Sequence, residues 1–260
     1  MLLREILDRL EQLSPASFAM DWDNSGLQLG DRDAEIRRVL IAVDATKEVI
    51  EEAVELKADL ILTHHPMIFS PIKNIVKDDV LGNKILTLAE HHIAVFSMHT
   101  NFDVIGMADE VADRLNLKHK RVLEVTFEDD ISKEGLGRYG MLPREMSLKE
   151  LAEEVKIKFK IPGVVMYGDG DAIVEKVGIL GGSGASVIPN AIQNKCQVLI
   201  TGDLKYHEVL DAMQEGLCLI DAGHFGIEKI FIPYMKDFFG RELREVTAIS
   251  SAQEGIGTFI

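Results

Sequence analysis

Histidines and carboxylates recur at three points of this sequence, each time within a few residues of the end of a short apolar run. The six residues are His64, His65, His99, Asp103, His224 and Glu228. Imidazole and carboxylate groups are common protein ligands of zinc, iron, manganese and nickel. A single zinc ion takes only three or four protein ligands, so a set of this size favours two ions about 3.5–4 Å apart. The residues therefore predict a dinuclear centre that could activate water.

The two later pairs, His99 with Asp103 and His224 with Glu228, share a spacing of four residues. Where the chain coils, this spacing brings both side chains to one side. Each acid also has a structural alternative. Asp103 could cap a helix, and Glu228 could favour the N-terminal end of a helix dipole.

The adjacent histidines His64 and His65 are ambiguous when taken alone. Neighbouring residues of a strand point to opposite faces, so two consecutive side chains do not usually serve one point. At the end of a strand, however, they can splay around a pair of ions, and Pro66 favours an extended conformation for His65. We expect this pair to bind metal only together with the later sites.

Short apolar runs rich in β-branched residues alternate with helical patterns along the chain, which predicts an α/β fold. The predicted strands are Val39–Val43, Leu60–Thr63, Ala94–Met98, Val177–Leu180, Val198–Thr201 and Leu217–Asp221. The predicted helices are Leu3–Leu13, Lys47–Leu56, Gly82–His91, Met107–Leu115, Leu148–Phe159, Ala185–Asn194, Tyr206–Met213 and Gly226–Phe239.

Two stretches of this pattern, residues 38–65 and 176–203, align without a gap, with Thr63 opposite Thr201. Apolar patterning alone could make any two strand–helix–strand units look alike. It does not require polar residues to recur at matching strand ends, so we favour an internal duplication. Two similar α/β domains would then pack around a metal cleft formed by the carboxyl ends of their strands.

We place the first domain at residues 1–125 plus 226–260 and the second at residues 126–225. Residues 122–143, which are rich in charge and glycine, are interpreted as the connection between them. His207 lies just after the second copy of the repeat, so it could line the same cleft without binding metal, as a substrate-binding residue. The glycine-rich segment 181–184 is interpreted as a tight strand-to-helix connection.

Composition narrows the classes of function further. Acidic residues outnumber basic ones 43 to 28, and the formal net charge of −15 disfavours nucleic acid and anionic membranes as partners. Cys196 and Cys218 cannot form a disulfide framework, which is typical of a reducing compartment. The first residues read as a charged amphipathic helix and no run reaches the length of a membrane span, so we expect a cytoplasmic protein.

Several segments together resemble the GTP cyclohydrolase I type 2 homologue family, whose members are related to a yeast NGG-interacting factor. These segments are DWDNSGLQLGD, ILTHHPMIF, SMHTNFD, LITGDLKYHE and DAGHFGIEK. The resemblance covers nearly the whole chain. It implies two α/β domains, a toroidal homohexamer and two metal ions held by His64, His65, Asp103, His224 and Glu228. It also implies that His99 lies near the ions and is not a settled ligand. We expect His99, or else His207, to act as the catalytic residue that moves a proton.

Three functions are compatible with these residues. The first is a metal-dependent hydrolase that opens the ring of a guanine nucleotide as a GTP cyclohydrolase does, a substrate that only the resemblance suggests. The second is a metal-dependent phosphoesterase, since paired ions commonly serve that reaction. The third is a non-catalytic metal-binding scaffold or adaptor. The ions could be zinc, iron, manganese or nickel, and the residues do not distinguish them.

Overall fold

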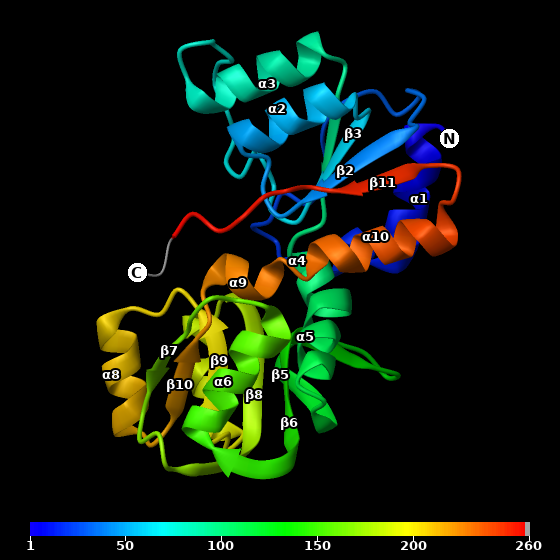
Figure 1. The fold of residues 1–260 in the computed structure, drawn as a ribbon. Helices are drawn as coiled ribbons and strands as arrows, with labels where there is room; N and C mark the ends of the chain where they lie inside the picture. Colours follow the sequence, from blue (N-terminus) through cyan, green and yellow to red (C-terminus); the bar gives the residue numbers. More distant parts are fainter. Residues whose placement is uncertain (258–260) are drawn as a thin grey trace. The chain divides into compact units, whose positions relative to one another are not determined.

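The structure is a computed structural model that describes residues 1–257, and the chain divides into two compact units (Figure 1). The first unit comprises Met1–Phe102 and Phe231–Glu254. The second comprises Asp103–Ile230 with the last described residues, 255–257. The sequence placed the boundaries instead at 125/126 and 225/226. Residues 118–125 lie with the second unit because they belong to a strand that pairs with its sheet.

The first unit is built on a five-stranded sheet with the order β1-β4-β3-β2-β11. Its strands are β1 (Gly26–Leu29), β2 (Arg38–Ala42), β3 (Leu60–Thr63), β4 (Ala94–Ser97) and β11 (Thr247–Ser250). The four strands from β4 to β11 are parallel, and β1 closes the edge in the antiparallel direction. The continuous burial of β2 and β3 is typical of parallel strands covered on both faces.

Helices of the first unit supply the apolar cover for this sheet. They are α1 (Leu3–Leu13), η1 (Ala16–Phe18), α2 (Lys47–Leu56), α3 (Val80–Glu90), α4 (Thr100–Phe102) and α10 (Phe231–Glu242). Val49, Ile50 and Ala53 of α2 join a core cluster with Leu40 and Ile61 of the sheet. Helix α10 packs against β2 and β11.

The second unit is built on a six-stranded sheet with the order β5-β6-β8-β9-β10-β7. Its strands are β5 (Lys118–Glu128), β6 (Lys133–Ser147), β7 (Val165–Tyr167), β8 (Ile173–Ser183), β9 (Val198–Gly202) and β10 (Cys218–Asp221). Strands β8, β9 and β10 are parallel and the other pairings are antiparallel. The remaining elements are η2 (Asp103–Met107), α5 (Ala108–Arg114), α6 (Leu148–Phe159), η3 (Ala185–Val187), α7 (Ile188–Gln193), α8 (Tyr206–Gln214) and α9 (His224–Glu228).

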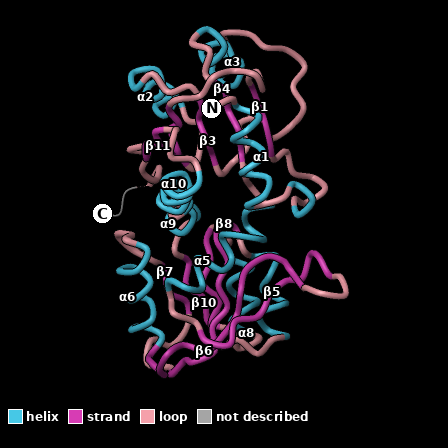
Figure 2. Tube along the Cα trace, turned by 90° about the vertical axis from the view of Figure 1, so that its right-hand side faces the viewer, coloured by secondary structure: helices cyan, strands magenta, loops and turns pink. Residues whose placement is uncertain are grey.

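The segment interpreted as a connection, residues 122–143, is instead part of a long hairpin. Strands β5 and β6 pair from Lys118 with Met141 to Glu128 with Lys133, and the tip of the hairpin extends beyond the rest of the second sheet (Figures 1 and 2). Many of its side chains are exposed, so the strands lack the apolar alternation by which a half-buried strand is recognised.

The two aligned stretches of sequence adopt the same local structure. Val39 lies opposite Leu60 in the first sheet, and Val177, the residue aligned with Val39, lies opposite Val198 in the second. The turns before the second strands also match. The carboxylate of Asp59 accepts hydrogen bonds from the backbone of residues 37 and 38, and the amide oxygen of Gln197 accepts them from residues 175 and 176.

The ends of the two aligned helices match as well, because Lys57 and Lys195 both adopt a left-handed conformation, with φ of 53° and 56°. These matched details are the structural basis for inferring a duplication. Both units are mixed α/β structures, as the sequence predicts. No helix within the described residues combines the length and the apolar character needed to cross a lipid bilayer.

Candidate metal centre

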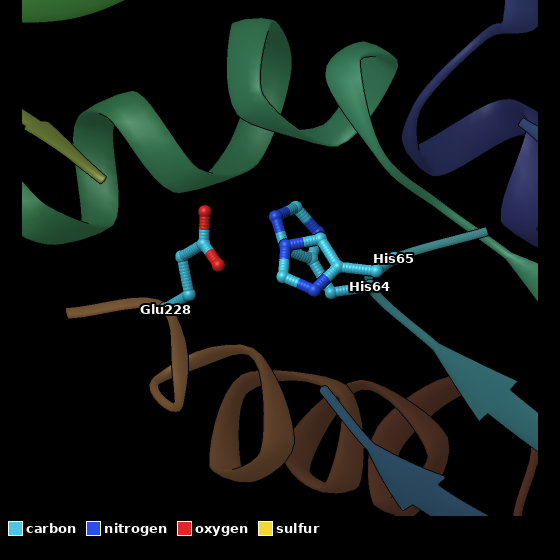
Figure 3. A group of neighbouring side chains, drawn as sticks. All are labelled: His64, His65 and Glu228. Atoms are coloured by element: carbon cyan, nitrogen blue, oxygen red, sulfur yellow. The ribbon is translucent and has the colours of Figure 1, made fainter. Parts of the chain in front are cut away.

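His64 and His65 lie at the carboxyl end of β3, where the chain turns into the loop before α3. Figure 3 shows both imidazole rings projecting from this strand end, and their centroids are 5.0 Å apart. The side chain of His64 is fully buried. Its Nδ1 donates a 2.8 Å hydrogen bond to the carbonyl oxygen of Met98, which fixes the orientation of the ring.

The His65 ring is oriented by a carboxylate, whereas the His64 ring is oriented by a backbone carbonyl. Its Nδ1 donates to Oδ1 of Asp44 at 2.7 Å, and Oδ2 of Asp44 accepts a hydrogen bond from Nε2 of Gln253 at 3.1 Å. The amide oxygen of Gln253 accepts from the backbone nitrogens of Val43 and Asp44. Asp44 itself follows β2, so two adjacent strand ends of the first sheet supply this arrangement.

His99 lies beside the same two histidines, with its ring centroid 5.5 Å from each of theirs. Its Nδ1 donates to Oδ1 of Asp23 at 2.8 Å. The carboxylate of Asp23 is fully buried, and its other oxygen accepts hydrogen bonds from Ser25 and Thr100. Burial alone would raise the pKa of Asp23. The hydrogen bonds from His99, Ser25 and Thr100 outweigh burial and hold that pKa well below its usual range.

The second unit carries His224 and Glu228 at the two ends of the short helix α9. Nδ1 of His224 donates to Oδ2 of Asp203 at 2.8 Å, and Nε2 lies 3.0 Å from Oε2 of the buried Glu228. Burial lowers the pKa of His224, but the hydrogen bonds and charges of Glu228 and Asp203 outweigh it and raise the pKa to about 9. The predicted spacing of four residues thus brings these two side chains together.

A glycine leaves room for this pair. Gly182 of β8 has a φ of +70°, and a Cβ atom there would press against Oε1 of Glu228 and lie 3.4 Å from Nε2 of His224. A side chain would therefore push the carboxylate away and would also strain the backbone. The glycine-rich segment is a tight connection, as predicted, and it also makes room for the two candidate ligands.

Asp103 begins η2, a single π-helical turn between α4 and α5. Single π turns inside helices are rare and frequently occur at functional sites. His207 lies at the start of α8, is exposed, and has its ring centroid 5.2 Å from that of Tyr206. The substrate-binding role of His207 stays a prediction.

Sequence reasoning missed the three aspartates that hold the histidine rings. The residues are Asp23, Asp44 and Asp203. For two of these aspartates, the position in the sequence could have indicated a role in the site. Asp44 directly follows a predicted strand, and Asp203 occupies the position of the repeat that His65 occupies in the first copy. Asp23 lies in the segment DWDNSGLQLGD, which contributed to the family resemblance but was assigned no role in the site.

The donor set fits divalent metal ions. Each of four histidines uses Nδ1 as a hydrogen-bond donor to an oxygen, so its neutral tautomer carries the lone pair on Nε2. Proteins orient metal-binding histidines in this way, most often through a carboxylate or a backbone carbonyl. His64 and His65 at the end of β3, and Glu228 at the end of α9, are side chains of the types that such ions take as ligands.

The fold and these residues define an α/β protein with two sheets and with clusters of histidine and carboxylate at the ends of its strands. The chain belongs to the Duf34/NIF3 (NGG1p interacting factor 3) family, whose sequence profile matches residues 1–254.

Individual relatives agree with this assignment. The chain is 36% identical to a GTP cyclohydrolase 1 type 2 homolog from Clostridium acetobutylicum over 228 residues, which is 87% of this chain and 85% of the relative. A solved Bacillus cereus protein related to NIF3 has a TM-score of 0.95 at 26% identity and covers 100% of this chain and 99% of its own. Reduced HcgD from Methanocaldococcus jannaschii has a TM-score of 0.82 at 32% identity and covers 96% and 97%.

Proposed function

We propose that the chain binds two divalent metal ions and uses them in hydrolysis. The proposed ligands are His64, His65, Asp103, His224 and Glu228. The observation that carries the proposal is the shared anchoring of the histidine rings through Nδ1, which presents Nε2 as the ligand atom. The two acids, Asp103 and Glu228, would add carboxylate oxygens to this ligand set.

The ions would lower the pKa of a water molecule and polarise the group under attack. The residues of the chain supply the remaining functions. His64, His65 and His224 are held in fixed orientations, which reduces the reorganisation needed on binding. His99 is held by Asp23 in the same way, and its Nε2 is the atom that would accept or deliver a proton during the reaction.

The proposed reaction is the ring-opening hydrolysis of a guanine nucleotide, with release of formate. The names of the curated relatives, GTP cyclohydrolase 1 type 2 homologs, support this substrate class. Incubation of the metal-loaded protein with GTP should release one formate for each GTP consumed and leave a diaminopyrimidine. A fluorescent pterin-like product would form only if that product then closes onto carbons of its ribose. Release of phosphate from a simple phosphodiester, without formate from GTP, would favour the phosphoesterase instead.

Metal binding can be tested separately from turnover. Purified wild-type protein should contain about two ions per chain by elemental analysis. His64→Ala and Glu228→Gln, one substitution in each unit, should each lower that content, whereas His91→Ala should leave it unchanged because His91 is exposed at the end of α3. Full metal content in both His64→Ala and Glu228→Gln would contradict the proposed ligand set.

The resemblance also suggests assembly, and we propose a homohexamer. Light scattering after size exclusion should then give a mass six times that of the 28.9 kDa chain.

The non-catalytic alternative has its own test. A chain that binds metal but hydrolyses neither GTP nor a phosphodiester would support the scaffold or adaptor.

A further inference from the structure

Two large aromatic side chains of the first unit, Trp22 and Phe69, are exposed and lie against each other. The side chains are 60% and 56% exposed, and their ring centroids are 6.0 Å apart at an interplanar angle of 49°. We refer to Trp22 and Phe69 as the aromatic pair. Exposing aromatic surface of this size to water is unfavourable in free energy, and an apolar or planar group that covers it would remove this penalty.

The aromatic pair is held in place by hydrogen bonds between the two segments that carry it. Nδ2 of Asn24 donates to the carbonyl oxygen of Ile68 at 2.6 Å, and the backbone nitrogen of Ile68 donates to the amide oxygen of Gln28 at 3.2 Å. Ile68 directly precedes Phe69, and Asn24 lies two residues after Trp22. The two rings are therefore positioned before any ligand arrives, which lowers the entropic cost of binding one.

The aromatic pair adjoins the histidine cluster of the first unit. The Trp22 indole meets the ring of His99 edge to face, with centroids 5.9 Å apart. His99 in turn lies 5.5 Å from the rings of both His64 and His65. The residue after Trp22 is Asp23, whose carboxylate holds His99, so one short turn positions both the indole and the imidazole.

We propose that the aromatic pair is a stacking surface for a planar heteroaromatic ring, such as a purine base, in the substrate that reaches His99. This inference rests on the proposed function and names the part of the substrate that the chain would recognise. Every base has a π face, so stacking on tryptophan and phenylalanine selects a flat ring without requiring positive charge. That form of recognition suits a chain with a net charge of −15.

Trp22 is the only tryptophan of the chain, so its fluorescence reports directly on this surface. Titration with guanosine of the protein incubated beforehand with divalent metal ions should quench the fluorescence to saturation. Ribose 5-phosphate, which has no base, should leave it unchanged. Trp22→Phe should abolish the signal yet retain binding by calorimetry. Trp22→Ala should weaken guanosine binding by about 10- to 100-fold. Absence of saturable quenching in the wild-type protein would overturn the inference.

Phe69→Ala should weaken binding as Trp22→Ala does, and Ile157→Ala, which removes an exposed apolar side chain of α6, should not. Because both rings are more than half exposed, all of these variants should unfold at the wild-type urea midpoint. If Trp22→Ala instead dissociates an assembly of the chain and leaves guanosine binding intact, the aromatic pair is a subunit contact and the inference is wrong.

These experiments distinguish a failure of the stacking surface from a failure of the proposed function. Quenching by guanosine without metal binding or turnover would contradict the proposed function and leave the stacking surface standing. Metal binding and hydrolysis that are both unaffected by Trp22→Ala and Phe69→Ala would overturn the stacking surface alone.

Discussion

The carboxylate of Asp44 accepts a 2.7 Å hydrogen bond from Nδ1 of His65. Asp203 accepts the corresponding bond from His224 at 2.8 Å in the second unit. Each aspartate fixes the tautomer and the direction of its imidazole, and each leaves Nε2 as the atom that would bind metal. The proposed ligands His65 and His224 are therefore oriented by aspartates that lie outside the proposed ligand set.

Asp44→Asn should weaken metal binding without unfolding the protein. The two oxygens of Asp44 accept from His65 and Gln253 separately, and in asparagine an NH2 group replaces one of these oxygens and would face a donor. Loss of such a partner typically costs about 10- to 100-fold in metal affinity. Competition with a chromophoric chelator would measure the loss, and Asp33→Asn, at an exposed ion pair with Arg4, is the matched control. Equal affinity in the two variants would contradict the role assigned to Asp44.

Gly182→Ala should displace Glu228 and reduce metal content. A Cβ atom at this position would press on Oε1 of Glu228, and its φ of +70° adds backbone strain of about 1–2 kcal/mol. Gly216→Ala separates the two effects, because Gly216 also has a positive φ, of +85°, but has nothing within 4 Å of the added atom. Both variants should lose stability in urea, and only Gly182→Ala should lose metal.

The two cysteines should differ in reactivity. Burial raises the pKa of the Cys196 thiol to about 11, so the thiolate fraction at pH 8 is on the order of one in a thousand. Burial also raises the pKa of Cys218, but that residue is only half-buried. A thiol reagent added to the native protein at pH 8 should therefore modify Cys218 first, and mass spectrometry would locate the label. Equal rates at the two sites would be inconsistent with the burial of Cys196.

Asp109 should contribute to stability against acid. Burial opposes ionisation, but hydrogen bonds from Lys120 and Arg138, at 2.9 Å each, outweigh it and lower the pKa of Asp109. The stabilisation is present above the unfolded pKa of about 3.9 and is lost as the pH falls through the lower folded value. The free energy of unfolding of Asp109→Asn should thus change less with pH below about 4 than that of the wild type. An unchanged slope would show that the network contributes nothing.

Much of this fold could be predicted from the sequence because the candidate metal ligands come shortly after apolar strands. Parallel strands such as β3 are continuous apolar runs, and the polar residues that follow them, such as His64, mark where each strand stops. The spacing of His224 and Glu228 was sufficient to predict that their side chains meet. The predicted boundary at 225/226 nevertheless separated them, whereas the structure has both in the second unit.

Other features depend on contacts far apart in the sequence. Asp23 and His99 are 76 residues apart, and no pattern in the sequence around either residue predicts that they are hydrogen-bonded. The single helix predicted at Gly226–Phe239 is divided into α9 and α10. Pro233 offers a physical reason, because proline has no N–H to donate to the carbonyl four residues earlier and is tolerated only in a first helical turn.

The position of Gln253 has a consequence for how the protein is made. Strand β11 closes the first sheet beside β2, and Gln253 then reaches back to Asp44 across 209 residues. A nascent chain emerges from the ribosome with its amino end first, so all of Asp103–Ile230 is synthesised before the first unit can be finished. The carboxylate that orients His65 thus gains the support of Gln253 only after all of Asp103–Ile230 has been translated.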